Sequence, residues 1–445
     1  MKILFISLGC DKNLVDTEMM LGMLVQKGHT ITDDEAEAEA VVVNTCCFIN
    51  DAKQESINTL LEMAQLRKDG AIKALIAAGC LAQRYREEIQ KEIPEVDAIV
   101  GTTAIDAITE ALDEALSGSA RNHIENIDKK PVYDKKRIVT TGGHFAYLKI
   151  AEGCDKHCSY CIIPSVRGKY RSIPQESLIA QARELAQLGV RELILVAQET
   201  TLYGVDLYGE KRLPELLRRL CEIEGLYWIR LLYCYPEEIT DELTDTIRKE
   251  EKICNYLDIP IQHASDAVLK RMGRRTTKRE LTDIVNKLRR EIPDICLRTT
   301  LITGFPGETK EDHEALLEFV DEMEFDRLGV FTYSPEEGTP AALFENQISE
   351  EVKLDRQADL MELQQEIAFE KAEDMAGRVL TVMVEGKLPD ENVYAARSYK
   401  DAPNVDGLVF IQTSRELLTG DFVRVKITGS YEYDLIGEID DEFTK

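Results

Sequence analysis

Short apolar runs alternate with longer polar stretches over the first part of the chain. The apolar runs are KILFIS (2–7), AVVVNT (40–45), KALIAA (73–78) and AIVG (98–101), and a segment compatible with a helix follows each of them. Strands rich in Val and Ile that are separated by helices form parallel sheets with both faces covered. The pattern therefore predicts a parallel α/β domain over residues 1–116.

The same alternation continues six times in the middle of the chain. The predicted strands are FAYLKIA (145–151), ELILVAQ (192–198), YWIRLLY (227–233), YLDIPIQ (256–262), LRTTLIT (297–303) and RLGVFTY (327–333). Six successive strand–helix units predict a partial or complete barrel of the TIM type, here taken as a partial (βα)6 barrel. In such a barrel the chemistry lies at the carboxyl ends of the strands.

The pattern changes after a long amphipathic helix that is predicted over 349–377. Five short strands with close turns follow, RVLTVMVEG, NVYAARSY, GLVFIQT, DFVRVKITGSYEY and DLIGEID. This pattern predicts a small closed β-barrel of OB-like character. The expected organisation is a sheet domain (1–116), a linker (117–139), a barrel domain (140–371) and a terminal β-barrel (372–445).

Composition and charge restrict the functions that the chain can have. The 445 residues are 44% hydrophobic and 31% charged, which is typical of a globular protein. No apolar stretch approaches the roughly 20 residues of a membrane helix, and the apolar N-terminal run is too short for a signal peptide, so we expect a cytoplasmic protein. The formal net charge of −28 argues against nucleic acid as the primary partner. It favours either simple solubility or a basic partner.

Three of the eleven cysteines lie on one predicted loop after the first barrel strand. They are Cys154, Cys158 and Cys161 in EGCDKHCSYCIIP. An odd number of cysteines in a cytoplasmic chain favours metal ligation over disulfides. Three close thiolates can hold three irons of a 4Fe-4S cluster and leave the fourth iron open. The alternative is a structural zinc ion with His157 as the fourth ligand.

A second group of three cysteines is spread over the N-terminal domain. Cys10, Cys46 and Cys80 follow the first three predicted strands, one strand–helix unit apart. Neighbouring parallel strands lie about 4.8 Å apart, so these cysteines converge on one sheet edge and predict a second cluster with an open iron. Because side chains alternate along a strand, only one of Cys46 and Cys47 reaches that site, and Asn-Thr-Cys favours Cys46. The four remaining cysteines are interpreted as packing residues, namely Cys221, Cys234, Cys254 and Cys296.

The loop with Cys154, Cys158 and Cys161 resembles the signature of the radical S-adenosylmethionine superfamily, with Tyr160 as its aromatic residue. This resemblance implies that S-adenosylmethionine binds the open iron and is split to a 5′-deoxyadenosyl radical. It also implies that Tyr160 contacts this cofactor, as does Gly304 in ITGFPGET, although a strand-to-helix turn would need a glycine there as well.

The whole chain resembles the methylthiotransferases, and its detailed segments resemble the RimO type. The segments are SLGCDKNLVDTE (7–18), AQETTLYGVDLYGE (197–210), IRLLYCYPEEI (229–239), LDIPIQHASDAVLKRMGR (257–274), TGFPGETKED (303–312) and FDRLGVFTYSPEEGTPAA (325–342). The resemblance implies two 4Fe-4S clusters, a terminal TRAM domain, and methylthiolation of an aspartate in the twelfth protein of the small ribosomal subunit. It also implies a separate electron donor and sulfur donor. The chain departs from the family at Cys47, Thr17 and Glu199, where a small residue, Ser and Asp are usual.

Two other functions share part of this pattern. A tRNA methylthiotransferase has the same clusters, but residues 372–445 contain 8 Lys and Arg against 15 Asp and Glu, and a β-barrel that grips RNA should be basic. This balance predicts a basic ribosomal protein as the partner. A non-catalytic electron carrier would need four protein ligands for each cluster, and neither group of cysteines supplies a fourth thiolate.

Overall fold

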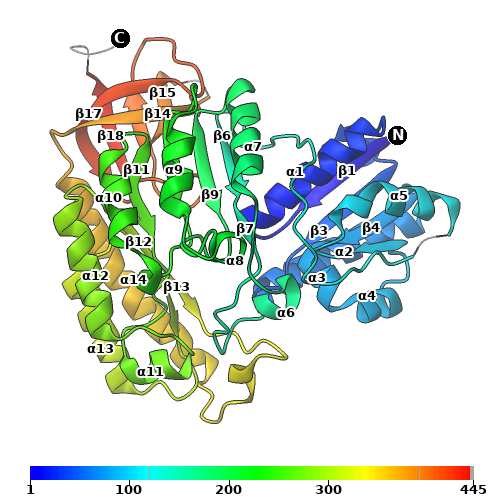
Figure 1. Ribbon diagram of the computed structural model, residues 1–445, viewed down its shortest axis with the longest axis horizontal. Helices are drawn as coiled ribbons and strands as arrows, with labels where there is room; N and C mark the ends of the chain where they lie inside the picture. The colour runs from blue at the N-terminus through cyan, green and yellow to red at the C-terminus, as the bar shows by residue number, and fades with distance from the viewer. Residues whose placement is uncertain (120, 390, 441–445) are drawn as a thin grey trace.

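The computed structural model describes residues 1–119, 121–389 and 391–440. Figure 1 shows a sheet domain in blue, a barrel domain in green and yellow, and a small β-barrel in orange and red at the opposite side of the molecule from the N-terminal sheet. The last five residues of the predicted terminal barrel lie outside the described residues. Within the described part of the chain, no helix is both long enough and apolar enough to cross a membrane.

The N-terminal domain is a five-stranded parallel sheet in the order β2-β1-β3-β4-β5, as the alternation predicted. Its strands are β1 Lys2–Ser7, β2 Thr30–Thr32, β3 Ala40–Thr45, β4 Ala74–Ala78 and β5 Ala98–Val100. Its helices are α1 Asp11–Gln26, η1 Glu35–Glu37, α2 Asn50–Lys68, α3 Gly79–Arg84, α4 Arg86–Glu92, η2 Ile105–Ala107 and α5 Ile108–Ser117. All residues of β3 and β4 are buried, because helices cover both faces of the sheet. The strands that precede Cys10, Cys46 and Cys80 are therefore adjacent.

The barrel domain contains a six-stranded parallel sheet in the order β13-β12-β11-β10-β9-β6, which confirms the partial barrel. Its strands are β6 Phe145–Lys149, β9 Glu192–Val196, β10 Trp228–Leu231, β11 Ile253–Asp258, β12 Cys296–Thr303 and β13 Arg327–Thr332, and β7 Ala151–Glu152 pairs with β8 Arg171–Ser172. Its helices are α6 Ile163–Arg167, α7 Gln175–Gln187, α8 Val205–Tyr208, α9 Leu213–Cys221, η3 Pro236–Glu238, α10 Asp241–Lys249, α11 Asp266–Arg271, α12 Lys278–Glu291, α13 Lys310–Met323, η4 Pro340–Leu343 and α14 Glu350–Glu373.

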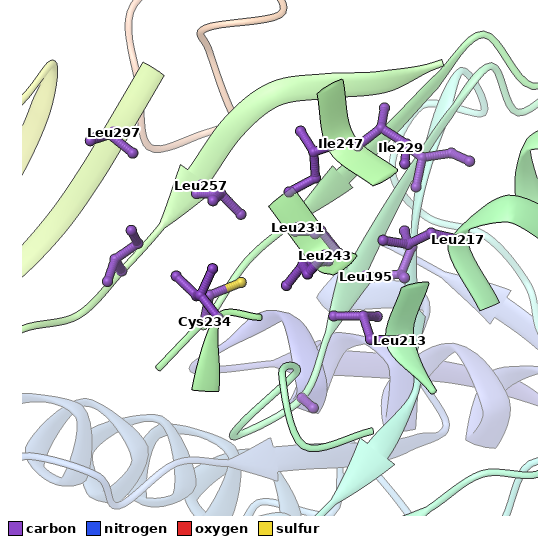
Figure 2. Packing of buried hydrophobic residues seen from close by; sticks show 14 of the residues in the cluster. Leu195, Leu213, Leu217, Ile229, Leu231, Cys234, Leu243, Ile247, Leu257 and Leu297 are labelled. Atoms are coloured by element: carbon purple, nitrogen blue, oxygen red, sulfur yellow. The ribbon is translucent and has the colours of Figure 1, made fainter. Parts of the chain in front are cut away.

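The barrel sheet buries apolar side chains on both faces. Leu195 and Leu231 point outward to the helices and pack with Leu217 of α9 and Leu243 of α10 (Figure 2). The alternate residue Ile194 belongs to a different cluster, which joins the inner face of the barrel strands to residues of the N-terminal and C-terminal domains. Successive side chains of a strand point to opposite faces of the sheet. Because both faces of this sheet are buried, the strands are continuous apolar runs in the sequence. The single cysteines pack in these two clusters, as predicted: Cys221 and Cys234 outside, Cys254 and Cys296 inside.

The C-terminal domain is a closed five-stranded barrel in the order β14-β15-β16-β18-β17, as predicted. Its strands are β14 Val379–Lys387, β15 Val393–Ser398, β16 Val409–Gln412, β17 Phe422–Tyr431 and β18 Asp434–Ile439. The domain contacts the barrel sheet where several strands begin: Arg327, the first residue of β13, pairs with Asp401 at 2.6 Å, and Glu192, the first residue of β9, pairs with Arg397 at 2.7 Å. Tyr256, within β11, donates to Asp406 over 2.7 Å. The carboxyl ends, where the cysteine loop lies, are therefore at the other end of the sheet.

Residues 121–141, which overlap the predicted linker (117–139), contain no helix and no strand, and they are attached to the domains on either side. The backbone N–H of Ile138 donates to the carbonyl of Glu18 over 3.0 Å, and Arg137 donates to the carboxylate of Glu18 over 3.0 Å. Glu18 is 1% exposed. The segment therefore fixes helix α1 against the barrel domain.

Two candidate cluster sites

The loop that carries Cys154, Cys158 and Cys161 follows β7 at the carboxyl end of the barrel sheet. Cys154 and Cys158 are buried, and Cys161 is half-buried. Burial raises the pKa of Cys154 to about 11, and the adjacent Cys158 sulfur contributes in the same direction. Burial and the sulfurs of Cys158 and Cys154 also raise the pKa of Cys161. The three sulfurs are therefore close to one another, and burial disfavours the free thiolate of Cys154 and of Cys161 unless a metal binds it.

Backbone hydrogen bonds hold this loop in place. The N–H of Cys154 donates to the carbonyl of Gly168, the N–H of Cys161 to that of Cys158, and the N–H of Ser159 to that of Met272, over 2.9 to 3.1 Å. The side chain of His157, the alternative zinc ligand, is exposed, and its backbone has a left-handed φ of 52°. The loop thus turns at His157 while the cysteines on either side of it face inward.

A buried arginine lies beside this cysteine loop. The guanidinium carbon of Arg274 is 4.3 Å from the ring centre of Tyr235, whose hydroxyl is 3.8 Å from the Cys158 sulfur. Arg274 is 7% exposed, and its Nη2 donates to the carbonyl of Pro260 over 2.9 Å. Its Nε and Nη1 atoms have no hydrogen-bond partner among the described residues. Because buried N–H groups normally have partners, these donors fit a carboxylate ligand.

Several other charged groups surround the loop. Lys156 pairs with Glu237 at 3.2 Å and lies 3.9 Å from Glu199, which is fully buried. Burial raises the pKa of Glu199 to about 7, although Thr201 donates to this carboxylate and Lys156 is close to it. Glu199 stands where the family usually has Asp, and the structure places this carboxylate close enough to influence Cys154.

The two predicted cofactor contacts lie at the same end of the barrel. The Tyr160 ring packs edge-on against the ring of Phe305, with 6.4 Å between the ring centres. Phe305 is the residue that follows Gly304. Gly304 has a left-handed φ of 70°, and a Cβ atom there would collide with the side chain of Lys353. The turn after β12 therefore requires glycine for its own geometry. Contact of Tyr160 or Gly304 with S-adenosylmethionine stays a prediction.

The second group of cysteines lies at the carboxyl ends of β1, β3 and β4. Cys10 precedes α1, Cys46 follows β3, and Cys80 lies in the first turn of α3. Cys10 is exposed, whereas Cys46 and Cys80 are 6% and 8% exposed. Burial is the largest cause of the raised pKa of Cys80; Arg167 lowers this pKa, and the sulfurs of Cys47, Cys46 and Cys10 raise it further. The tertiary structure thus brings the three sulfurs into one electrostatic neighbourhood.

Asn13 connects the three turns that carry these cysteines. Its Nδ2 donates to the carbonyls of Leu8 and Thr45, both over 3.0 Å, and its Oδ1 lies 3.8 Å from the Cys80 sulfur. Asn13 is 1% exposed. A side-chain amide can bridge separate loops because it both donates and accepts. The amide therefore fixes the strand ends that carry Cys10, Cys46 and Cys80.

Cys46 and Cys47 point in different directions. A Cβ atom added to Gly9, whose φ is +89°, would lie 2.8 Å from the Cys46 sulfur, so Cys46 faces the turn that carries Cys10. Cys47 is 1% exposed and packs in an apolar cluster with Val41 and Val43, and this cluster also contains Cys80. The position of Cys46 against the turn that carries Cys10 therefore supports Cys46 as the ligand.

The two cysteine sites lie on either side of one short segment after β10. Tyr235 lies beside Cys158, as described above. Tyr233, with a left-handed φ of 59°, donates to Asp11 over 3.3 Å, and the Lys12 ammonium lies 3.3 Å from its ring centre. Non-glycine residues in this backbone region are uncommon and occur often at functional sites. The segment 233–235 therefore contacts the loop with Cys158 through Tyr235, and the first turn of helix α1, which begins after Cys10, through Tyr233.

Among the described residues, no three His, Cys, Asp or Glu side chains converge on the position of a single metal ion. A 4Fe-4S cluster requires a wider arrangement, because each thiolate binds a different iron. Two groups of three thiols, with the orphaned donors of Arg274 beside one of them, fit such clusters.

Comparisons with known proteins agree with this architecture. The chain matches the uncharacterized protein family UPF0004 over residues 2–101, the radical SAM superfamily over 148–320 and the TRAM domain over 376–439. A ribosomal protein uS12 methylthiotransferase RimO from Lachnoclostridium phytofermentans is 62% identical over 437 residues, which cover 98% of this chain and 99% of that relative. The chain belongs to the RimO family. RimO proteins from Acetivibrio thermocellus and Clostridioides difficile are 50% and 49% identical, over 100% and 99% of this chain and 99% of each relative.

Solved structures with the same fold are more distant than these RimO relatives. The radical S-adenosylmethionine methyltransferase TsrM from Kitasatospora setae, with cobalamin and a [4Fe-4S] cluster bound, superposes with a TM-score of 0.55 at 14% identity, over 91% of this chain and 82% of TsrM. The cobalamin-dependent radical enzyme OxsB gives a TM-score of 0.54 at 11% identity, over 81% of this chain and 56% of OxsB. At these identities the likeness concerns the fold alone.

Sequence reasoning missed the polar residues that support the two sites. They are Asn13, Lys156, Arg167, Tyr233 and Arg274. Each of them lies within or close to a segment that contains the cysteines or resembles the family. Nearness to such a segment is therefore the one feature of the sequence that could have indicated their role. Their partners are distant in sequence, and periodicity carries no information about them.

Proposed function

We propose that this chain adds a methylthio group to the β-carbon of an aspartate in ribosomal protein uS12, with two 4Fe-4S clusters and S-adenosylmethionine. The observation that carries the proposal is the 62% identity to a RimO protein over nearly the whole chain. The position of the two groups of cysteines on either side of residues 233–235 adds geometric support. We also propose that the reaction takes place in the cytoplasm, where ribosomal proteins are made.

The chemistry explains why two sites of this kind are needed. A polar nucleophile cannot attack an unactivated C–H bond. A 4Fe-4S cluster with bound S-adenosylmethionine supplies the one-electron chemistry that breaks such a bond. Cys154, Cys158 and Cys161 would hold this cluster, and Cys10, Cys46 and Cys80 would hold the one that serves sulfur delivery. The electron donor and the sulfur donor are separate components.

Residues of this chain would orient and shield the reactants. The Nε and Nη1 atoms of Arg274 can bind a carboxylate beside Cys158. Tyr235 stacks under the guanidinium and limits its movement. Cys154 and Cys158 are themselves buried, and their low exposure to water strengthens the electrostatic interactions within the site.

Charge supports a basic protein as the substrate. Residues 372–445 contain nearly twice as many acidic as basic side chains. Glu391, Glu416 and Glu432 of the C-terminal domain are exposed, so their charge is available to a partner. Opposite charge accelerates encounter with a basic protein such as one that binds ribosomal RNA, and added salt weakens the effect.

The test uses the full chain, reconstituted anaerobically with iron and sulfide and supplied with dithionite and S-adenosylmethionine. Purified uS12 and an anticodon stem-loop RNA are offered separately, and mass spectrometry measures the methylthio group on each. We expect modification of one aspartate of uS12, at a rate that falls with added salt, and no modification of the RNA. Methylthiolation of the RNA with unmodified uS12 would contradict the proposal and favour a tRNA methylthiotransferase.

A further inference from the structure

Arg167 of the barrel domain reaches into the N-terminal cysteine site. It is the last residue of α6, shortly after Cys161, and its side chain is 2% exposed. Its Nε donates to the Cys80 sulfur over 3.3 Å, and its Nη2 donates to Asn13. A single side chain from the segment that follows one cysteine group thus touches a member of the other.

A buried ion cluster holds this guanidinium in place. Nη1 of Arg167 lies 2.7 Å from Asp16 of α1 and 3.2 Å from Glu152 of β7. Lys149 pairs with the same two carboxylates, at 2.7 Å in the case of Glu152. Two fixed cations therefore balance two fixed anions, and Arg167 keeps its charge next to Cys80.

We propose that Arg167 is a positioning residue that raises the reduction potential of a cluster held by Cys10, Cys46 and Cys80. This inference rests on the second cluster of the proposed function. Hydrogen bonds to ligand sulfurs and local charge both set the potential of such clusters. Reduction adds one electron and no proton, so it adds one negative charge. The N–H donor and the positive charge of Arg167 stabilise that charge, and the effect is strong because both Arg167 and Cys80 are buried.

The test isolates the N-terminal cluster in the full chain by replacing Cys154, Cys158 and Cys161 with Ala. In this background we compare Arg167→Gln, Arg167→Lys and an unchanged Arg167. The readouts are iron and sulfide content and the midpoint potential from a dithionite titration followed by electron paramagnetic resonance. We expect Arg167→Gln to make reduction at least tenfold less favourable, a shift of about 59 mV to more negative potential. Arg167→Lys keeps the charge without the planar fork, so its shift has the same direction and is smaller.

Lys149→Gln is the matched control. Lys149 pairs with the same two carboxylates as Arg167, so its replacement also removes one cation from the ion cluster. Unlike Arg167, Lys149 has no hydrogen bond to Cys80 in the described part of the chain. Lys149→Gln should therefore destabilise the domain contact as Arg167→Gln does, but it should shift the potential less. If the Arg167→Gln protein does not fold, the shift in midpoint potential of the Arg167→Lys protein tests the inference.

Two results overturn the inference in different ways. Equal shifts in the Lys149 and Arg167 variants, or no shift in either Arg167 variant, would reduce Arg167 to a purely structural role. Absence of iron from the background protein with Arg167 intact would instead remove the second cluster, and with it the proposed function and this inference together.

Discussion

Glu192, the first residue of strand β9, and Arg230 of the neighbouring strand β10 form an ion pair in which both side chains are fully buried. The Arg230 Nε lies 2.7 Å from Oε1 of Glu192. The C-terminal domain completes the arrangement, since Arg397 binds the other oxygen of Glu192 at 2.7 Å and the carbonyl of Tyr399 accepts from Arg230. The C-terminal domain is therefore part of the barrel's structure as well as a surface for partners.

We expect Arg397→Met to lower the free energy of unfolding by about 3 to 5 kcal/mol, because it removes one partner of a buried carboxylate. Chemical denaturation under anaerobic conditions measures this change. Lys426→Ala in the same domain is the control, since Lys426 is exposed and its loss should change stability by less than about 0.5 kcal/mol. Similar effects of both substitutions would contradict the buried-network interpretation.

The two cysteine groups should separate by function. Cys158→Ala should abolish both 5′-deoxyadenosine formation and methylthiolation, because it removes a ligand beside Arg274. Cys80→Ala should retain cofactor cleavage and lose methylthiolation, because Cys80 lies in the other domain. Chromatography of 5′-deoxyadenosine and mass spectrometry of uS12 measure the two steps. Full methylthiolation by the Cys80 variant would refute the second cluster.

Cys47 should not be a ligand, because Cys46, its neighbour, is the residue whose sulfur lies against the Gly9 turn that carries Cys10. We expect Cys47→Ala to keep all the iron, roughly eight atoms for two 4Fe-4S clusters, and Cys46→Ala to lose about half of it. Iron and sulfide analysis after reconstitution provides the measurement. The reverse result would mean that the end of β3 is rotated by one residue.

Arg274→Met should remove the carboxylate anchor beside Cys158. Hydrogen bonds to a charged group contribute about 1.5 to 3 kcal/mol, so we expect binding of S-adenosylmethionine to weaken about 10- to 100-fold. Equilibrium binding of labelled S-adenosylmethionine checks this, with the exposed neighbour variant Arg275→Met as control. If the Arg274 variant binds S-adenosylmethionine normally but forms no methylthiolated uS12, Arg274 binds the carboxylate of the substrate aspartate instead. If neither cofactor binding nor product formation changes, Arg274 has no binding role.

Glu199 should make stability depend on pH. Burial raises its pKa from 4.5 to about 7, so the folded state binds this proton more tightly than the unfolded state does. The cost of the charged form is absent below pH 4.5, grows as the pH rises to 7 and is then constant at about 3 kcal/mol. We therefore expect Glu199→Gln to stabilise the chain, by about 1 kcal/mol more at pH 8 than at pH 6.

Denaturation at the two pH values tests the Glu199 prediction. Glu224→Gln is the control, because Glu224 is exposed and its substitution should have the same small effect at both values. A stabilisation by Glu199→Gln that does not change with pH would show that relief of a buried charge is not its cause.

Much of the fold could be predicted from sequence because parallel strands buried on both faces leave a strong local pattern. The fifteen strands predicted for the two sheets and the terminal barrel lie close to where that pattern put them. The missed strand β2, Thr30–Thr32, has three residues at the sheet edge and half-exposed side chains. It is too short and too polar to show a period. The cysteine spacing also indicated two sites, because chain order and strand order coincide for β1, β3 and β4.

The sequence by itself determined the three-part architecture and the six cysteines proposed as ligands, since local periodicity and motif spacing carry that information. Only the tertiary structure decided that Arg167 meets Cys80, that Arg274 is buried with free donors beside Cys158, and that the C-terminal domain packs on the barrel end away from the cysteine loop. Each of these depends on which distant segments are neighbours in space. A buried charge or donor is fixed by its partners, and those partners are set by packing rather than by any pattern along the chain.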